Sequence, residues 1–261
     1  MTAPVNEPTA PTTAPTTGPE ETEAEKVRVR AKFEDARGFW DPLWDPVLDA
    51  DPNLLDAYID LSSVPWQDGT LSPKERELVY VAMNASTTHL YETGVRVHLR
   101  NAIGHGATPA EAMAVLAVVS EVGGHTMMSV LPLLAGELAA RPGNDAPAVA
   151  PGPWPAAAEA LAPRYLAAAR RYSEVTRERG VLREPFRLLL AVAAAASATH
   201  LHLPAVQHHI RAALDGGVDW HEIVEVLEVV AMVGVHTLTE YARVVAEEFA
   251  DRAEGTEPGA R

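Results

Sequence analysis

Apolar residues recur at helical spacing along most of the chain. The clearest stretch begins at Thr108-Pro109, where Glu111 follows Thr108 by three residues. This arrangement is typical of a capping box with proline in the first helical turn. The apolar residues that then recur every three positions are Met113, Leu116, Val119 and Val122. The pattern predicts an amphipathic helix from Thr108, with a kink at Gly123-Gly124.

Two further helices are predicted upstream of this one. Ser72-Pro73, followed by charged residues, predicts a capped helix that runs to about Ser86. After a break between Thr87 and Tyr91, a second helix is expected to end at a turn with glycine at 104 and 106. No stretch requires a strand, so the predicted fold class is all-α.

A shift of 111 positions superimposes two halves of the sequence without a gap. From Thr88 to Thr126, 17 of 39 positions are identical to their partners, three histidines among them. This self-similarity indicates a duplicated structural unit. We predict a disordered tail over residues 1–26, a first repeat over 27–140, a Pro- and Gly-rich linker over 141–155, a second repeat over 156–250 and a tail over 251–261. The two repeats are expected to pack as a pseudo-dimer.

The ordered motifs of both copies resemble the carboxymuconolactone decarboxylase family, which shares the alkylhydroperoxidase D-like fold. The first copy has the segment Leu71-Ser-Pro-Lys-Glu-Arg-Glu-Leu78, and the motif then continues through His98, Ala102, Gly106, Thr108 and Glu111. The second copy repeats its core as His209, Ala213, Gly217, Asp219 and Glu222. The resemblance implies an all-helical fold and assembly into a homo-oligomer, with a trimer of two-repeat chains as the natural arrangement.

Thiol chemistry is excluded because the sequence contains no cysteine. The peroxidase branch of the family carries Cys-x-x-Cys before its histidine, whereas Tyr91 and Gly94 occupy those positions in the first copy, and His202 and Ala205 occupy them in the second. The decarboxylase branch lacks the cysteines and needs no metal or organic cofactor. The resemblance therefore implies a cofactor-independent lyase or isomerase that acts on a small carboxylated or lactone substrate.

Histidine is the residue type best suited to acid–base chemistry near neutral pH. The resemblance points to His98, His209 and Glu77 as catalytic residues, although Leu188 replaces the glutamate in the second copy. Residues expected to line the substrate sites are His89, His125, His200, His236, Tyr91 and His202. If the helices on either side of Gly106 form a hairpin, His89 and His125 of one copy lie at similar heights in one cleft. His105, His208 and His221 have no counterpart and are expected to face solvent.

Two alternatives to acid–base catalysis remain open from the sequence. Three neutral imidazoles can hold a metal ion with an open coordination position, which would make the protein a His-ligated metalloenzyme. Against a shared metal site, His89 and His98 would lie on opposite faces of one continuous helix. The duplicated histidines can instead serve only to satisfy buried polar groups in a non-catalytic binding or scaffold protein.

The charge of the chain restricts its partners. The formal net charge is −15 and the sequence pI is about 5.0, so we expect neither nucleic acid nor an anionic membrane as a partner. The sequence shows neither a secretory leader nor a spanning run of about 18 uninterrupted apolar residues. We therefore expect a cytoplasmic protein whose partner is a small-molecule substrate.

Overall fold

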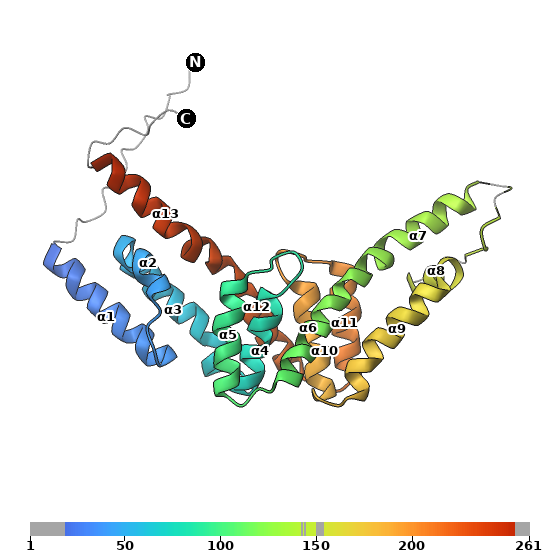
Figure 1. Ribbon diagram of the computed structural model, residues 1–261, viewed down its shortest axis with the longest axis horizontal. Helices are drawn as coiled ribbons and strands as arrows, with labels where there is room; N and C mark the ends of the chain where they lie inside the picture. Colours follow the sequence, from blue (N-terminus) through green and yellow to red (C-terminus); the bar gives the residue numbers. More distant parts are fainter. Residues whose placement is uncertain (1–18, 142, 144, 150–153, 254–261) are drawn as a thin grey trace, which may run out of the picture. The chain divides into compact units, whose positions relative to one another are not determined.

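The computed structural model describes residues 19–141, 143, 145–149 and 154–253 (Figure 1). This part of the chain is helical and contains no strand, which confirms the all-α prediction. In chain order its elements are α1 (Pro19–Arg37), η1 (Pro42–Trp44), α2 (Asp45–Ala50), α3 (Pro52–Gln67), α4 (Pro73–Asn84), α5 (Glu92–Gly104), α6 (Pro109–Ser120), η2 (Glu121–Gly124), α7 (His125–Ala139), α8 (Trp154–Leu161), α9 (Pro163–Glu178), α10 (Glu184–Ala196), α11 (Leu203–Asp215), α12 (Trp220–Ala231), η3 (Met232–Val235) and α13 (His236–Ala253).

The two-repeat organisation is visible in the bounds of the helices. The shift of 111 that relates the sequences takes α3, α5, α6 and η2 onto α9, α11, α12 and η3 without a change of length. The predicted capping boxes are present at Ser72 and Thr108, and Asp219 forms the equivalent box in the second copy. The repeat therefore begins no later than α3. The identical positions in the sequence comparison started only at Thr88, so α3 and its counterpart α9 extend the repeat towards the N-terminus.

The predicted tails and linker are shorter than expected. Residues 19–26, assigned to the first tail, belong to α1, and α13 continues to Ala253. Trp154 already starts α8 inside the predicted linker. The rest of both tails and part of the linker lie outside the described residues.

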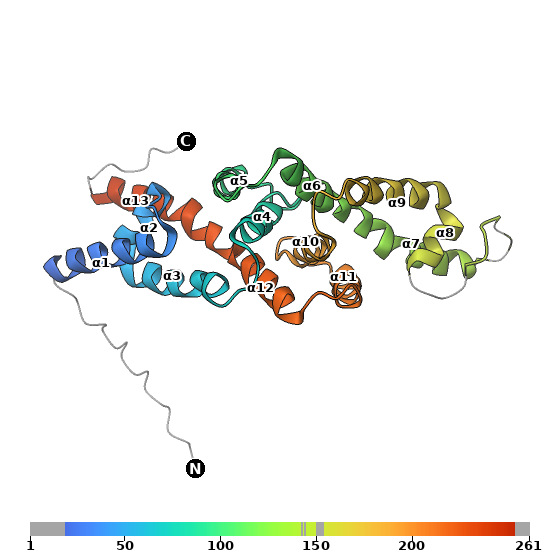
Figure 2. The ribbon, with the colours of Figure 1, turned by 90° about the horizontal axis from the view of Figure 1, so that it is seen from below.

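The chain divides into two compact units, and the larger one comprises Ser62–His236. Its centre consists of α4, α6, α10 and α12, which pack against one another (Figure 2). Fully buried side chains from the two copies meet there, Leu78 and Val115 from the first and Leu189 and Val226 from the second. Helices of the two copies thus interleave in one core, as expected for a pseudo-dimer. Around the core, α5 packs on α4, α11 packs on α10, and α7 packs on α8.

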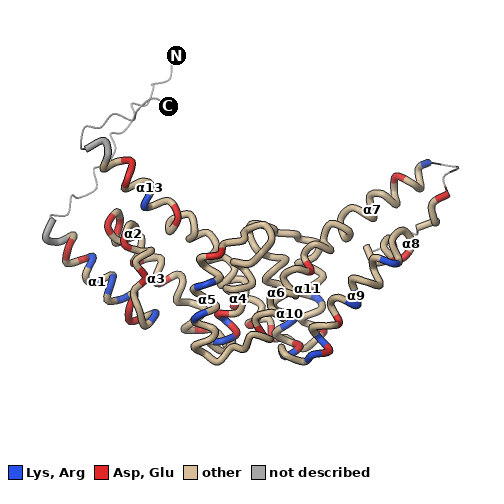
Figure 3. Tube along the Cα trace, viewed as in Figure 1, with Lys and Arg blue, Asp and Glu red and all other residues tan. Residues whose placement is uncertain are grey.

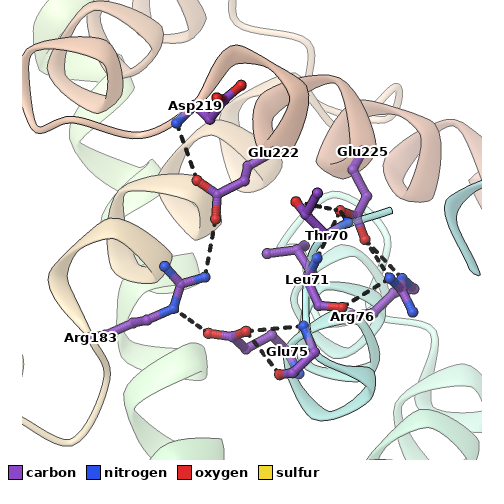
Figure 4. A network of polar contacts seen from close by, with 9 residues as sticks. Thr70, Leu71, Glu75, Arg76, Arg183, Asp219, Glu222 and Glu225 are labelled. Carbon is purple, nitrogen blue, oxygen red and sulfur yellow. Dashed lines mark hydrogen bonds and ion pairs between the residues drawn. The ribbon is translucent and has the colours of Figure 1, made fainter. Parts of the chain in front are cut away.

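A buried ion pair joins the two copies within this unit (Figure 4). Arg76 donates to one carboxylate oxygen of Glu225 from Nε at 2.9 Å and from Nη2 at 2.7 Å. The other oxygen accepts bonds from the backbone N–H groups of Thr70, at 2.6 Å, and Leu71, at 2.9 Å. Both charged side chains are almost fully buried. Their hydrogen-bonding capacity is largely satisfied, which is the condition under which a buried pair is tolerated.

The smaller unit comprises the described parts of residues 1–61 and 237–261. Three aromatic rings organise its N-terminal helices. Trp44 stacks on Tyr58 with ring centroids 4.9 Å apart, and Phe33 lies 5.6 Å from Trp44. On the surface of the same helices, Asp56 accepts hydrogen bonds from Arg28 and Lys32.

One described stretch, Pro109–Ala139, is long and apolar enough to cross a membrane by length and composition alone. It comprises α6, η2 and α7, and 44% of its most apolar window is buried inside the protein. Figure 3 shows how few charged residues α6 and α7 carry. A partly buried core helix has the same composition, so this stretch is only weak evidence for a membrane span.

Candidate functional site

Two equivalent turns present the first pair of duplicated histidines. In the first copy, His89 donates its backbone N–H to the Ser86 carbonyl at 2.8 Å, and Leu90 adopts a left-handed conformation with φ of 49°. The same turn recurs in the second copy, with Leu201 at φ of 35°. A non-glycine residue in this conformation is strained, and such strain concentrates at functional sites. The two turns meet at Thr88 and Thr199, whose hydroxyls lie 3.0 Å apart.

The duplicated histidines pair between the copies, not within them. His89 Nε2 lies 2.8 Å from His236 Nδ1, and His200 Nε2 lies 2.7 Å from His125 Nδ1. The shift of 111 turns one pair into the other. The expectation that His89 and His125 of a single copy share a cleft is therefore wrong, because the core interleaves the copies and brings the start of α13 to His89 and the start of α7 to His200.

The residues in the former cysteine positions lie beside these pairs. Tyr91 is centred 4.4 Å from the His236 ring and 5.6 Å from the His89 ring. His202 stacks on His125 with ring centroids 4.8 Å apart, and its Nε2 contacts the Ser129 hydroxyl. All six residues expected to line substrate sites thus fall into two clusters, one of His89, Tyr91 and His236 and one of His125, His200 and His202.

His98 has two close side-chain partners in the first copy. Its Nδ1 lies 2.7 Å from Glu77 Oε2, and the Tyr80 ring stacks on the imidazole with centroids 4.3 Å apart. Asn101 donates to the other oxygen of Glu77 at 3.2 Å. The structure therefore brings together the two residues that the resemblance paired, and it adds a tyrosine that covers one face of the imidazole.

His209 is the counterpart of His98 in the second copy, and the residues around it are smaller or apolar. Leu188 stands for Glu77, Ala191 for Tyr80 and Ala212 for Asn101. These three residues and His209 line a cavity of about 630 Å³. This volume is in the range of sites for small ligands. We refer to it below as the His209 cavity.

The His209 cavity combines apolar walls with a few polar groups. One of them, Arg187, is buried and binds Glu184 through Nε at 2.9 Å and Nη2 at 2.8 Å. Its counterpart Arg76 has the buried Glu225 as a partner, but Ala114 takes the place of that glutamate in the first copy. His208, expected only to face solvent, is exposed and also lines the cavity. His105 and His221 are exposed as expected.

Burial keeps His125 and His209 neutral. It lowers the pKa of His125 to about 3, with the neighbouring imidazoles, His209 first, adding to the effect. It also lowers the pKa of His209 to about 4, with smaller contributions from His208 and Arg187. The His125 and His209 rings are centred 5.9 Å apart. Near pH 7 both are neutral imidazoles that can accept a proton.

Among the described residues, no three His, Asp or Glu side chains form a group able to hold a metal ion. In the cluster of His125, His200 and His202, the His125 and His200 rings meet edge to edge through the nitrogens that lie 2.7 Å apart, and the His202 ring stacks on His125 at an inclination of 15°.

Sequence reasoning missed the charged residues of the His209 cavity, which are Glu121, Arg170, Arg177 and Arg187. Glu121 is a single acid within an apolar run, and Arg187 is the counterpart of Arg76 in the first-copy segment Leu71–Leu78. The signal that could have found Glu121 is a comparison of the copies, because Met232 occupies its place in the second. The same comparison shows Tyr80 replaced by Ala191.

Comparisons with known proteins agree with this architecture. Residues 52–135 and 163–248 each match the model of the Carboxymuconolactone decarboxylase family. A crystal structure from Burkholderia xenovorans LB400, provisionally named as a gamma-carboxymuconolactone decarboxylase subunit, is similar with a TM-score of 0.78 and 30% identity, and the match covers 86% of this chain and 97% of that one. No curated protein matches the sequence.

Proposed function

The chain belongs to the carboxymuconolactone decarboxylase family, and from this premise we propose that it is a cofactor-independent lyase or isomerase for a small carboxylated or lactone substrate. Family membership and the similar structure support a decarboxylase-like function. The finer assignment places the reaction in the His209 cavity, with His209 as the acid–base residue. The proposal extends to assembly as a homo-oligomer in the cytoplasm.

The observation that carries the assignment is a neutral imidazole beside a guanidinium in a largely apolar cavity. His209 and Arg187 both line the His209 cavity, and Arg187 is buried. A buried guanidinium attracts a carboxylate and orients it, even in a protein of net charge −15. The apolar wall makes that attraction stronger than it would be in water.

The chemistry that these groups support is loss of a carboxylate with proton transfer. As the bond to the carboxylate breaks, carbon dioxide leaves and its electron pair remains on the adjacent carbon, which a neighbouring carbonyl stabilises as an enolate. That carbon then takes one proton. A bound anion raises the pKa of a nearby imidazole, so the substrate brings His209 closer to the range in which it can transfer a proton. An isomerisation would use the same kind of proton transfer, but the bond between the carboxylate and the adjacent carbon would stay intact.

His98 with Glu77 forms a second candidate acid–base pair. The carboxylate fixes the imidazole through Nδ1, an arrangement that selects one tautomer and leaves the other ring nitrogen for proton transfer. Tyr80 covers one face of this ring, whereas His209 opens onto the cavity. We therefore assign the main activity to His209 and expect His98 to contribute less.

The test is turnover with γ-carboxymuconolactone and a panel of small lactone acids, with release of carbon dioxide and conversion of substrate both measured. We expect His209→Gln to lower kcat by roughly 100-fold or more, the scale of a lost acid–base residue. His221→Gln, which changes an exposed histidine outside the cavity, is the matched control and should leave kcat unchanged. Unaltered turnover in the His98→Gln and His209→Gln double variant would remove the histidines from the mechanism.

The proposal also states that no metal takes part. Turnover should survive dialysis against EDTA, and elemental analysis of protein purified without an affinity tag should find no stoichiometric metal. Activity that disappears with EDTA and returns with one added divalent ion would instead support the metalloenzyme. No turnover by the unmodified protein on any member of the panel would favour a binding role.

A further inference from the structure

Glu121 is a half-buried acid that the acid–base assignment above does not use. It lies in η2, between α6 and α7, and lines the His209 cavity. Its Oε1 is buried and has no hydrogen-bond partner among the described residues. Leaving a carboxylate oxygen buried and unpaired costs free energy, so this position needs an explanation.

The fold itself does not require an acid at this position. The equivalent turn η3 has the same length and carries Met232 in place of Glu121. Met232 is buried in an intact turn, so the backbone forms as well with an apolar side chain. The cost of Glu121 is therefore not offset by a local structural role.

The His209 cavity gives Glu121 mostly cationic or neutral neighbours. The charged or titratable side chains of the packed elements that line it together with Glu121 are Arg170, Arg177, Tyr165 and Tyr172 on α9, Arg187 on α10, His208 and His209 on α11, and His125 on α7. Among them, Arg187 and Arg177 attract the carboxylate form, and the Ser173 side chain hydrogen-bonds it. Arg187 also donates two hydrogen bonds to Glu184.

We propose that the His209 cavity binds a small carboxylate together with one proton, which Glu121 carries. The entering carboxylate meets the guanidinium groups that line the cavity and also Glu121, whose Oε1 has no hydrogen-bond partner among the described residues. Two carboxylates cannot share so small a volume while both are ionised, so one proton must enter with the ligand. Protonated Glu121 then donates a hydrogen bond to the ligand.

The electrostatics of the free protein point in the same direction. Burial raises the pKa of Glu121 above its ordinary value, even though Ser173, Arg187 and Arg177 oppose this effect. A bound anion would raise the pKa further. Protonation of Glu121, which the proposed binding requires, is therefore easier than for an exposed glutamate even before the ligand binds.

This inference deepens the proposed function, since it assigns the substrate class and a proton-carrying residue to the same cavity, but it can be tested without turnover. Benzoate is a suitable probe because it is a planar carboxylate that fits the cavity volume, and benzamide is its neutral isostere. Isothermal titration calorimetry in buffers of different ionisation enthalpy counts the protons taken up with each benzoate. The measurement is made between pH 5 and 8.5 on the full chain.

We expect benzoate to bind with uptake of up to one proton and to bind at least tenfold more tightly than benzamide. Its affinity should fall by up to tenfold per pH unit on the alkaline side of the Glu121 pKa. In Glu121→Gln, benzoate should still bind, but proton uptake and the pH dependence should be lost. Glu174→Gln, an exposed acid on α9 outside the cavity lining, is the matched control and should behave like the unmodified protein.

Three results would overturn the proposal. They are the absence of benzoate binding at millimolar concentration, binding without proton uptake across the pH range, and uptake that persists in Glu121→Gln but disappears in His209→Gln. Circular dichroism of each variant separates these results from loss of folding, and Glu121→Met provides a second variant that the equivalent turn already tolerates. Proton-coupled benzoate binding without turnover of any lactone acid would refute the lyase assignment and leave this inference intact.

Discussion

Exchanges at single positions determine what surrounds the two equivalent histidines, His98 and His209. Tyr80 stacks on His98, whereas Ala191 leaves the corresponding side of His209 open to a cavity of about 630 Å³. Alanine in place of the phenol side chain leaves room at this position, and Ala191 lines the cavity. Substitutions at this scale should therefore change binding with little effect on the fold.

Ala191→Tyr tests this at the cavity. The new ring should occupy the space that Tyr80 occupies beside His98, and it should weaken benzoate binding at least tenfold. Because the side chain enters existing space, the midpoint of thermal unfolding should change by no more than a few degrees. Calorimetry and circular dichroism measure the two effects. Benzoate binding that is unaffected in a folded variant would place the ligand elsewhere.

Acid should destabilise the protein through His125 and His209. Their pKa values are lowered to about 3 and about 4 in the folded protein, below the value near 6.5 of an unfolded chain. Between the folded and unfolded pKa values the unfolded state binds more protons than the folded state. The contribution of these two histidines to stability is therefore fully present above about pH 6.5 and is lost as the pH falls towards 4 and then 3. The loss amounts to at most about 1.4 kcal/mol per pH unit for each histidine.

Urea unfolding at pH 7, 6 and 5 measures this dependence. His125→Gln should flatten the decline of the unfolding free energy with acid, relative to the unmodified protein at each pH. His221→Gln, at an exposed position, should not. Parallel declines in the unmodified protein and His125→Gln would show that this imidazole does not resist protonation.

At the scale of elements, the helices could be predicted from the sequence because their ends carry local signals. Ser72, Thr108 and Asp219 each form a capping box, which depends only on residues three positions apart. The extent of α1 was not predicted, since a Glu-rich segment without apolar periodicity has the composition of a tail.

The arrangement of the site was much harder to predict than its residues. Every histidine expected to line a site lies in one of the two clusters, but His89 pairs with His236 across 147 positions. Such a pairing depends on how the copies interleave, which no local pattern encodes. The His209 cavity was also missed, because Ala191 and Ala212 resemble ordinary small residues of a packed helix.

The turns before α5 and α11 give a prediction at this scale. Leu90 and Leu201 adopt left-handed conformations with exposed side chains, so their apolar groups contribute little packing. Asparagine tolerates this conformation better than leucine. Leu90→Asn should therefore raise the free energy of unfolding by roughly 0.5–1 kcal/mol, measured by urea unfolding with an unchanged m-value. Thr87→Ala, in the same turn, serves as the control, and a loss of stability in Leu90→Asn would mean that the leucine side chain is needed.

At the scale of the whole molecule, the larger unit has one core that both copies complete. Apolar side chains of α4 and α6 are buried against α10 and α12. Neither copy covers these faces alone. The buried bond between Arg76 and Glu225 depends on both copies as well.

Separation of the copies tests this dependence. Residues 1–140 expressed alone should not form a stable monomer, and residues 154–261 should behave in the same way. When the two pieces are mixed, they should associate into a 1:1 complex that recovers cooperative thermal unfolding, as followed by light scattering and circular dichroism. A monomeric fragment that unfolds cooperatively on its own would show that the copies are independent domains.

The shared polypeptide has a consequence for how the two sites can differ. In a dimer of identical subunits every mutation appears in both subunits. Replacing the tyrosine that covers the histidine with alanine would therefore uncover the histidine in both halves at once. Here Tyr80 and Ala191 are encoded separately, and each half can change while its counterpart is preserved. The fused polypeptide therefore allows an inherited asymmetry, in which one half keeps a covered histidine and the other keeps one that opens onto a cavity.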